Sequence, residues 1–236
     1  MRLVAIESAT PASSVALMED GDVVASASRI DRRGHSAFLT AALDFCLDQA
    51  DWSPSDLDGV AVGIGPGLYT GLRVGIATAQ GLAATLGIPI VPVTSLDALA
   101  HRSKTGRRHI WAIVDLRRGE FAVASYRPVP GGVVRDSPPE VVTPQGLRAM
   151  LLSDADDILL VGDVPALGEG FLTGLHRARV GRPRYPSAVA VAGLGGPRIA
   201  HDDVPHPDEV RPLYLRDPDV TVSSALMEMK SPWEDA

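Results

Sequence analysis

The sequence lacks the features that define several large classes of protein. Its 236 residues include one cysteine, Cys46, so neither an internal disulfide framework nor a cysteine-based zinc site can form. It has no run of 18 apolar residues, and its start, MRLVAIESAT, turns polar too early for the apolar core of a signal peptide. We therefore expect a soluble, unprocessed cytoplasmic protein with no membrane association.

Positive charge is also in short supply. The chain has 22 Lys and Arg residues against 29 Asp and Glu residues, which gives a net charge of -7. This balance argues against a protein that wraps nucleic acid by itself. Two basic stretches, at 102–109 and 177–184, could still meet phosphates locally. We expect any role with RNA to be indirect and shared with a partner protein.

Complete catalytic motifs are missing as well. No His-x-x-x-His pair and no Gly-x-Ser-x-Gly elbow occurs. The cluster HDDVPH at 201–206 has metal-ligating residue types, but its prolines prevent a helical face, so we interpret it as a solvated loop. A turn containing Asp115, Arg117, Arg118 and Glu120 is interpreted as a charged hairpin turn, and Gly195-Gly196 as a surface loop rather than an adenine-binding one. These patterns predict no catalytic residue, no metal and no cofactor.

Strand and helix patterns alternate along the first 100 residues. Three short strands joined by the tight turn EDGD open the chain, and helices then alternate with buried strands. The expected strands are 2–7, 14–18, 23–28, 59–64 and 88–93, and the expected helices are 35–50 and 70–86. This order predicts an α/β fold, with a mixed sheet covered by helices.

A second lobe is expected after the polar, basic stretch at 101–108. It begins with another strand pair, at 110–114 and 121–126, so the two lobes are interpreted as structurally related to each other. Later elements are expected at 144–152 (helix), 157–163 (strand) and 165–176 (helix), and the glycine and proline density of 181–212 prevents an assignment there. The predicted domains are 1–103 and 104–216, followed by a weakly ordered tail at 217–236.

Residues 63–83, GIGPGLYTGLRVGIATAQGLA, form the most distinctive segment. It has no lysine for a P-loop, and Leu68 replaces the third glycine of a dinucleotide-binding fingerprint. Two interpretations stay open for the loop: a vestigial anion site at the start of the next helix, or a structural turn with a helix N-cap. The residues concerned are Gly65, Pro66, Gly67 and Thr70.

Two helices carry patterns that favour close packing. In the second helix, Gly71, Gly75, Ala79 and Ala83 recur every four residues and form a stripe with almost no side chain. In the first helix, apolar residues flank a narrow polar row on both sides, among them Phe38, Ala42 and Phe45. The stripe could pack on the first helix of the same chain or on a helix of a partner. We predict a protein-binding surface made of these seven residues.

Several segments together resemble the bacterial TsaB (YeaZ-type) family of tRNA threonylcarbamoyladenosine synthesis. They are VAIESATPASSVAL, HSAFLTAAL, the segment from VAVGIGPGLYTGLR to VTSLDALA, VDLRRGEFAVASY and RPLYLRDPD. The resemblance covers both lobes, and Leu68 and Tyr69 stand where the family usually has Ser and Phe. It implies a two-lobed actin/Hsp70/sugar-kinase (ribonuclease H-like) fold.

The resemblance also implies a role as a non-catalytic partner. The related TsaD-type subunit carries the catalysis, and its two metal-binding histidines correspond to Ser95 and Leu99 here. The implied partners are that TsaD-type subunit and a TsaE-type ATPase, with tRNA contacted through the complex, and the same surface could pair two copies into a homodimer. The alternative is a nucleotide-dependent kinase or ATPase that uses a cleft between 7–10, 65–67 and Asp115.

Overall fold

The structure is a computed structural model and describes residues 1–31, 34–103 and 107–216. The first part of the chain contains β1 (Arg2–Glu7), β2 (Ala12–Glu19), β3 (Asp22–Ile30), α1 (His35–Ala50), η1 (Pro54–Asp56), β4 (Gly59–Gly63), α2 (Tyr69–Leu86), β5 (Ile90–Val93) and α3 (Ser95–Arg102). The second part contains β6 (His109–Arg117), β7 (Glu120–Val129), β8 (Gly132–Arg135), β9 (Glu140–Val142), α4 (Pro144–Ser153), β10 (Ile158–Gly162), η2 (Val164–Leu167), β11 (Ala178–Val180), α5 (Ala188–Ala200) and η3 (Pro207–Glu209). The predicted tail, 217–236, lies outside the described residues.

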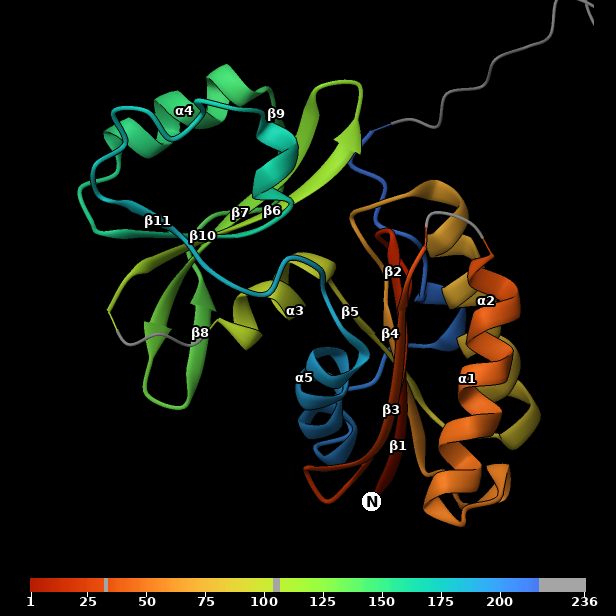
Figure 1. The fold of residues 1–236 in the computed structure, drawn as a ribbon. Coiled ribbons are helices and arrows are strands. Elements are labelled where there is room, and N and C mark those ends of the chain that lie inside the picture. Colours follow the sequence, from red (N-terminus) through yellow and green to blue (C-terminus); the bar gives the residue numbers. More distant parts are fainter. Residues whose placement is uncertain (32–33, 104–106, 217–236) are drawn as a thin grey trace, which may run out of the picture.

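Two mixed β-sheets form the two lobes (Figure 1). The first sheet has the strand order β3-β2-β1-β4-β5, and the second has the order β8-β7-β6-β10-β11. In each sheet an antiparallel meander comes first, and its opening strand then pairs in parallel with a later strand. The same topology therefore occurs twice, which confirms the predicted two-lobed α/β architecture and the kinship of the lobes.

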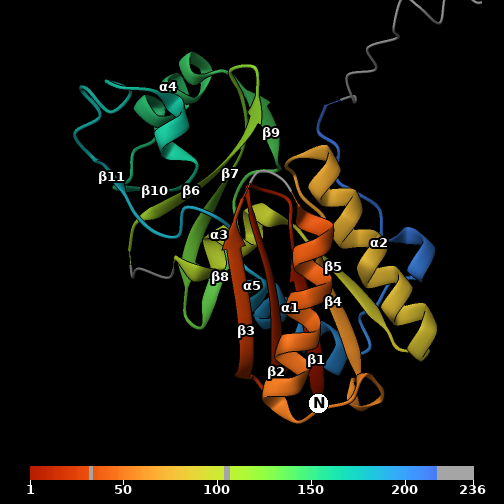
Figure 2. The same ribbon diagram turned by 45° about the vertical axis from the view of Figure 1, so that its right-hand side comes forward.

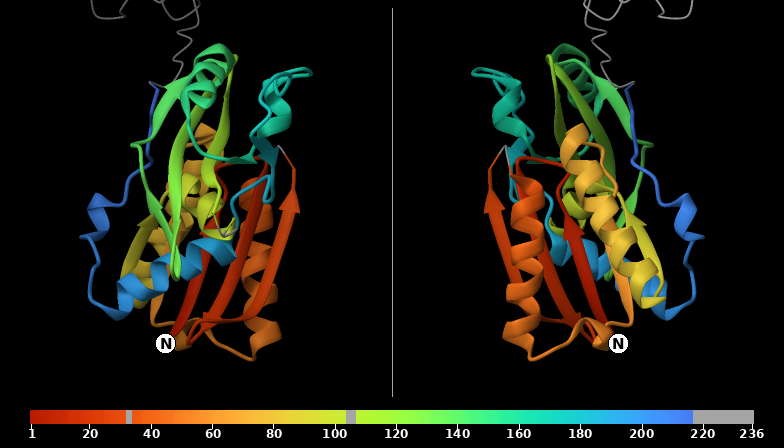
Figure 3. Two further views of the ribbon diagram at one scale, coloured as in Figure 1. Left: turned by 90° about the vertical axis from the view of Figure 1, so that its left-hand side faces the viewer. Right: turned by 90° about the vertical axis from the view of Figure 1, so that its right-hand side faces the viewer.

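Helices cover both faces of each sheet, as Figures 1 and 3 show. In β1, Val4 and Ile6 face the core beneath α1 and α2, whereas Leu3 and Ala5 face the core beneath α5. This alternation follows from the two-residue period of a strand. In the second lobe, α4 covers one face and α3 covers the other, so α3 lies between the lobes.

The first hairpin turn lies where the sequence predicts a tight turn. Asp20 and Gly21 both have positive φ angles, 51° and 95°, between β2 and β3. Positive φ at both central residues is the type I′ turn that matches the twist of a two-residue hairpin. The predicted strand pair and its turn are confirmed.

The predicted lobe boundary separates the two sheets but does not separate the chain. The second lobe was predicted to hold all of 104–216, whereas α5 packs on the first sheet. After α5, residues 207–216 run along α2 to the second lobe (Figure 3). Val210 is buried in the core of the first lobe, and Arg216 pairs with Glu120 at 2.8 Å. The assignment of all of 104–216 to one lobe was therefore wrong.

Two local predictions in the second half were also wrong. The expected helix at 165–176 is a short 3₁₀ turn, η2, because Gly168, Gly170 and Gly174 follow it with positive φ angles that end a helix. The unassigned stretch at 181–212 contains α5. Gly195 lies inside this helix, where an added Cβ would stand 2.6 Å from the Ala61 Cβ, so its glycine permits close packing rather than forming a loop.

Candidate protein-binding face and the glycine segment

A buried carboxylate at the end of β1 packs against the start of the glycine segment. Glu7 has no exposed surface; its Oε1 accepts a hydrogen bond from the Ala9 amide at 2.7 Å, and its Oε2 accepts one from Ser95 Oγ at 3.1 Å. Burial raises the pKa of Glu7 from 4.5 to about 7, because removal from water disfavours the charged form and these hydrogen bonds offset only part of that cost. Gly63 is shaped to this carboxylate, since a Cβ there would lie 2.1 Å from Glu7 Oε2.

The loop after β4 closes against the turn between β1 and β2. A Cβ on Gly67 would lie 2.0 Å from the Ala9 carbonyl oxygen, and the Leu68 amide donates to that oxygen at 2.6 Å. Gly65 and Pro66 are buried in the same contact. The geometry therefore favours the structural interpretation of Gly65, Pro66 and Gly67 over an anion site.

The helix after the loop begins without the predicted cap. Thr70 was expected to be the N-cap of this helix, but α2 already starts at Tyr69, and Leu68 is its N-cap with no side-chain hydrogen bond. Thr70 instead lies exposed in the first turn of α2. The predicted N-cap was therefore wrong.

The stripe Gly71, Gly75, Ala79 and Ala83 faces the protein's own sheet. A Cβ on Gly71 would lie 2.1 Å from the Ser8 carbonyl oxygen, and one on Gly75 would lie 2.3 Å from Ser8 Oγ. Ala79 and Ala83 are buried in the first-lobe core. A partner cannot reach this stripe in the folded chain, so the prediction that these four residues contact one was wrong. Their small size lets α2 lie directly on the end of β1.

The three α1 residues predicted to bind a partner differ in how far they are buried. Ala42 is buried in the core, and Phe38 is half-buried against it, whereas 52% of Phe45 is exposed. The buried face of α1 packs on β2 and β3. The prediction that Ala42 contacts a partner was therefore wrong. Of the three α1 residues predicted for this surface, Phe45 is the most exposed.

A second set of residues, small except for Phe45, is exposed on the same two helices, which lie side by side in Figure 2. The exposed members are Ala37, Ala41 and Phe45 on α1 and Ala77, Gly81 and Ala84 on α2. We call these six residues the outer face. Gly81 differs from Gly71 and Gly75, because among the described residues an added Cβ would meet no atom within 4 Å beyond its chain neighbours and its own helix backbone. The sequence prediction included Phe45 but missed the α2 part of this face, because α2 has small residues on both sides.

A cavity of about 600 Å³ opens beside the first turns of α1 and α2. Its lining includes Ser36, Thr70 and, from the second lobe, Arg117. The Arg117 guanidinium is paired with Asp115 at 3.3 Å, and the Arg117 amide donates to the same carboxylate at 2.7 Å. The charged hairpin turn therefore forms an internal pair and also borders this cavity.

Ser95 and Leu99, the two positions that the resemblance matched to metal-binding histidines, lie in different surroundings. Ser95 donates to Glu7 in the first lobe, whereas Leu99 is buried in the core beneath the second sheet. In the HDDVPH segment, Asp203 pairs with Arg198 at 2.9 Å, and His206 Nδ1 lies 3.5 Å from an Asp208 carboxylate oxygen. Asp203 and His206 are both exposed. Neither group forms a converging set of ligands.

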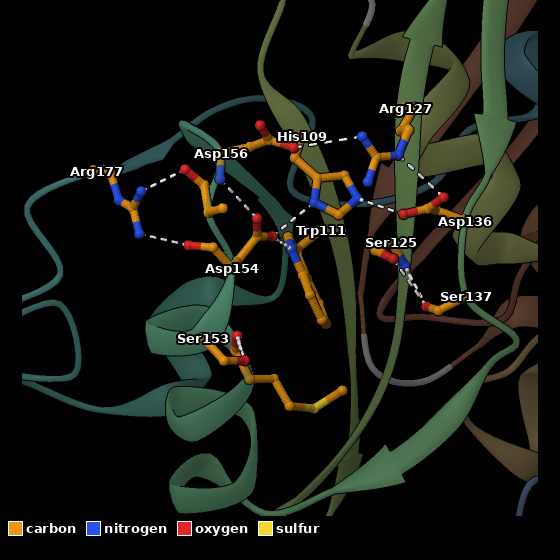
Figure 4. Close-up of polar contacts among 12 residues, drawn as sticks. His109, Trp111, Ser125, Arg127, Asp136, Ser137, Ser153, Asp154, Asp156 and Arg177 are labelled. Carbon is orange, nitrogen blue, oxygen red and sulfur yellow. Dashed lines mark hydrogen bonds and ion pairs between the residues drawn. The ribbon is translucent and has the colours of Figure 1, made fainter.

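A separate polar network lies at the start of β6 (Figure 4). Ligand atoms of His109, Asp154 and Asp156 lie within 4.8 Å of one another, the spacing of a metal site. However, Asp154 Oδ2 accepts from Trp111 Nε1 at 2.8 Å and lies 2.6 Å from His109 Nδ1. Asp156 lies 3.5 Å from Arg127. The carboxylates are thus already used by donors of the chain, and the network holds β6 to the loop before β10.

Two arginines of the basic stretch at 177–184 donate hydrogen bonds to backbone carbonyls of the chain. Arg177 donates to the Asp154 carbonyl at 2.5 Å, and Arg179 donates to the His176 carbonyl at 3.1 Å (Figure 4 shows Arg177). Whether these guanidinium groups also meet phosphates stays a prediction.

The duplicated sheet topology defines a class of protein. Two lobes, each opening with a strand meander and joined through α3, give the two-lobed α/β fold of the actin/Hsp70/sugar-kinase class. Among the described residues, no helix combines the length and the apolar character that a bilayer-spanning segment needs.

Known proteins identify the family within this class. The family model described as TsaD, tRNA N6-adenosine threonylcarbamoyltransferase, matches residues 25–146. The chain is 31% identical over 223 residues to the tRNA threonylcarbamoyladenosine biosynthesis protein TsaB of Escherichia coli, covering 92% of this chain and 95% of that protein. It is 29% identical over 210 residues to the TsaB protein of Bacillus subtilis, covering 89% and 85% of the two chains. The solved structure of YeaZ from Pseudomonas aeruginosa superposes with a TM-score of 0.77 at 27% identity, covering 91% of this chain and 99% of that one. The chain belongs to the TsaB (YeaZ-type) family.

Proposed function

We propose that this protein acts in tRNA threonylcarbamoyladenosine biosynthesis as a non-catalytic subunit. In this role it binds and activates a TsaD-type catalytic subunit, which transfers threonylcarbamoyl to N6 of adenosine 37 in tRNAs that read ANN codons. A TsaE-type ATPase joins the complex, tRNA is contacted through it, and the setting is the cytoplasm. The names of the two TsaB relatives support the pathway.

One observation carries the role of a partner: the outward position of Gly81. A glycine inside a helix costs about 0.5–1 kcal/mol relative to alanine. The sheet leaves no room for a side chain at Gly71 and Gly75, which explains glycine there. At Gly81, by contrast, a Cβ would meet no atom of the described residues within 4 Å, apart from those of its chain neighbours and its own helix backbone. A second helix packed on the outer face supplies the missing reason, since small residues let two helices approach closely.

The remaining outer face has the composition of a docking surface. Ala37, Ala41, Ala77 and Ala84 add little side-chain volume, and Phe45 provides a large exposed apolar group. Aromatic side chains are enriched in protein interfaces, and small residues let two helices approach closely. The outer face is therefore the surface on which we place the TsaD-type subunit, and a second copy of the chain is a competing occupant of it.

Two substitutions test this function without entering the core. Ala77→Glu and Gly81→Leu each place a larger group on the outer face, and we expect co-purification with the TsaD-type subunit to be lost while thermal unfolding of the free chain stays near that of the wild type. Ala149→Glu, on the exposed side of α4, is the matched control and should bind normally. Normal binding by both outer-face variants would contradict the proposal.

The alternative is a nucleotide-dependent kinase or ATPase that uses a cleft between 7–10, 65–67 and Asp115. The cavity of about 600 Å³ beside Arg117 lies next to this region, but none of those residues is among its lining residues. The side chains predicted for its catalytic cleft are engaged elsewhere: Glu7 is fully buried, Ser8 Oγ donates to the Gly71 carbonyl at 2.8 Å, and Asp115 is paired with Arg117. Calorimetric titration of the free chain with ATP and magnesium separates the two functions, since tight magnesium-dependent binding and turnover would favour the enzyme.

A further inference from the structure

An arginine contacts two stacked tyrosines at the first turns of α2. The rings of Tyr69 and Tyr214 are stacked with their centroids 5.1 Å apart and an angle of 25° between their planes. The Arg73 guanidinium lies over the Tyr69 ring, 3.9 Å from its centroid, and Arg73 Nε donates to Tyr214 Oη at 3.1 Å. We call these three residues the Arg73 anchor.

The chain fixes this anchor from both lobes. Tyr214 lies on the segment that follows α5, whose neighbouring Leu213 amide donates to the Ile64 carbonyl at 2.8 Å. Two residues further on, Arg216 pairs with Glu120 of the second lobe at 2.8 Å. A guanidinium held in one plane by stacking and one hydrogen bond loses little further freedom when it binds a ligand.

The charge of the anchor is left without a counterpart. Arg73 is exposed, and in the parts of the chain that the structure describes no carboxylate pairs with it, because its one hydrogen bond goes to a neutral phenol. An arginine has five N–H donors in a planar fork that matches the two oxygens of a carboxylate. The anchor is therefore preorganised for an anionic group.

The anchor also adjoins the outer face. Arg73, Ala77 and Gly81 follow one another at intervals of four residues and are all exposed, so they form one row along α2. Asp44 and Asp48 are exposed on α1 toward its C-terminal end. The first turns of α1 and α2 meet at the opposite end, where Tyr69 of the Arg73 anchor lines the cavity. The surface is thus positive at one end and negative at the other.

We propose that the Arg73 anchor receives a carboxylate side chain of the partner protein that docks on the outer face. The proposal depends on the proposed function and adds the chemistry of the partner: an acidic residue must meet the first turn of α2, beside a helix that packs on the row of small residues. An acidic residue at the opposite end would be repelled by Asp44 and Asp48, so the charges also set the direction in which the partner lies. Tyrosine and arginine clusters of this kind are frequent hot spots in interfaces.

The test measures the affinity of the chain for the TsaD-type subunit by calorimetry at low and high salt. Arg73→Gln should weaken binding on the order of tenfold to a hundredfold at low salt, as expected for loss of a charge-assisted pair, and the difference should shrink at high salt. Arg73→Lys keeps the charge but not the planar fork, and it should restore part of the loss at most. Arg179→Gln, an exposed arginine of the second lobe, is the matched control and should bind as the wild type does.

The outcomes separate this proposal from the proposed function. If Arg73→Gln binds normally while Ala77→Glu does not, the anchor has no role in docking and the outer face stands. If both bind normally, the proposed function fails as well. If inorganic phosphate binds the free wild-type chain through Arg73 while the variant keeps full affinity for the partner, the anchor serves a small anion and the proposal is overturned. Circular dichroism of each variant checks that the fold is retained.

Discussion

Replacement of Glu7 by glutamine should stabilise the protein at alkaline pH, although it alters a buried and hydrogen-bonded group. Burial raises the pKa of Glu7 from 4.5 to about 7 in the folded chain. At about 1.4 kcal/mol per pKa unit, the charged form in the folded state costs about 3 kcal/mol relative to the unfolded chain. Glutamine keeps the shape of the side chain and carries no charge. Its carbonyl can accept from the Ala9 amide, and its NH₂ group can donate to the Ser95 hydroxyl.

The sign of the effect follows from proton binding. Between pH 4.5 and about 7 the folded chain keeps a proton on Glu7 that the unfolded chain releases. The contribution of this group to the free energy of unfolding is therefore fully present below pH 4.5, falls as the pH rises through this window, and is absent above it. Glu7→Gln removes that dependence and should differ little from the wild type at pH 4.5, yet exceed it by up to about 3 kcal/mol at pH 8.

Urea denaturation at pH 4.5, 6 and 8 measures this difference directly. Glu169→Gln, at an exposed position, controls for the loss of one negative charge and should leave the pH profile of stability unchanged. The reasoning fails if Glu7→Gln is less stable than the wild type at pH 8, or if the gap between the two proteins is the same at all three pH values. Either result would mean that the carboxylate is favourably charged in the fold.

Three further predictions concern stability. Gly75→Val should destabilise the chain by about 3 kcal/mol or more, because its Cβ would lie 2.3 Å from Ser8 Oγ on the sheet; a urea midpoint close to that of the wild type would show that α2 can shift at no cost. Gly81→Ala should stabilise the free chain by about 0.5–1 kcal/mol, since the new Cβ would meet no described atom within 4 Å beyond its chain neighbours and its own helix backbone; an unchanged or lower thermal midpoint would contradict this. Asp154→Asn should flatten the loss of stability in acid. Desolvation opposes the charged form of Asp154, but hydrogen bonds from the Asp156 amide, the Trp111 indole and His109 outweigh it and hold the pKa of Asp154 below 3.8. The contribution of this carboxylate to the free energy of unfolding is therefore present above pH 3.8 and is lost as the pH falls further. An acid titration identical to that of the wild type would contradict this prediction.

Local patterns predicted much of the fold. The type I′ turn at Asp20-Gly21 and the extent of α1 and α2 follow from chemistry within a few residues, so the sequence was sufficient for them. The helix expected at 165–176 fails because three glycines prefer turn conformations that the apolar pattern concealed. The helix α5 was missed for the opposite reason: Gly195 and Pro197 suggest a loop, but the close approach of α5 to Ala61 needs a residue without a side chain.

The candidate binding face was also predictable from the sequence only in part. The sequence by itself determined that α2 is a helix of small residues and that no complete catalytic motif accompanies it, because both properties are written in residue types and their spacing. It could not decide which small residues face inward, since one period of four places Gly71 and Gly75 on one side and Ala77 and Gly81 on another. Only the tertiary structure decided this, because Ser8 at the end of β1 occupies the space beside Gly71 and Gly75, while the space beside Gly81 stays open. The Arg73 anchor likewise exists only in the folded chain, since Tyr69 and Tyr214 are far apart in the sequence and are brought together by folding.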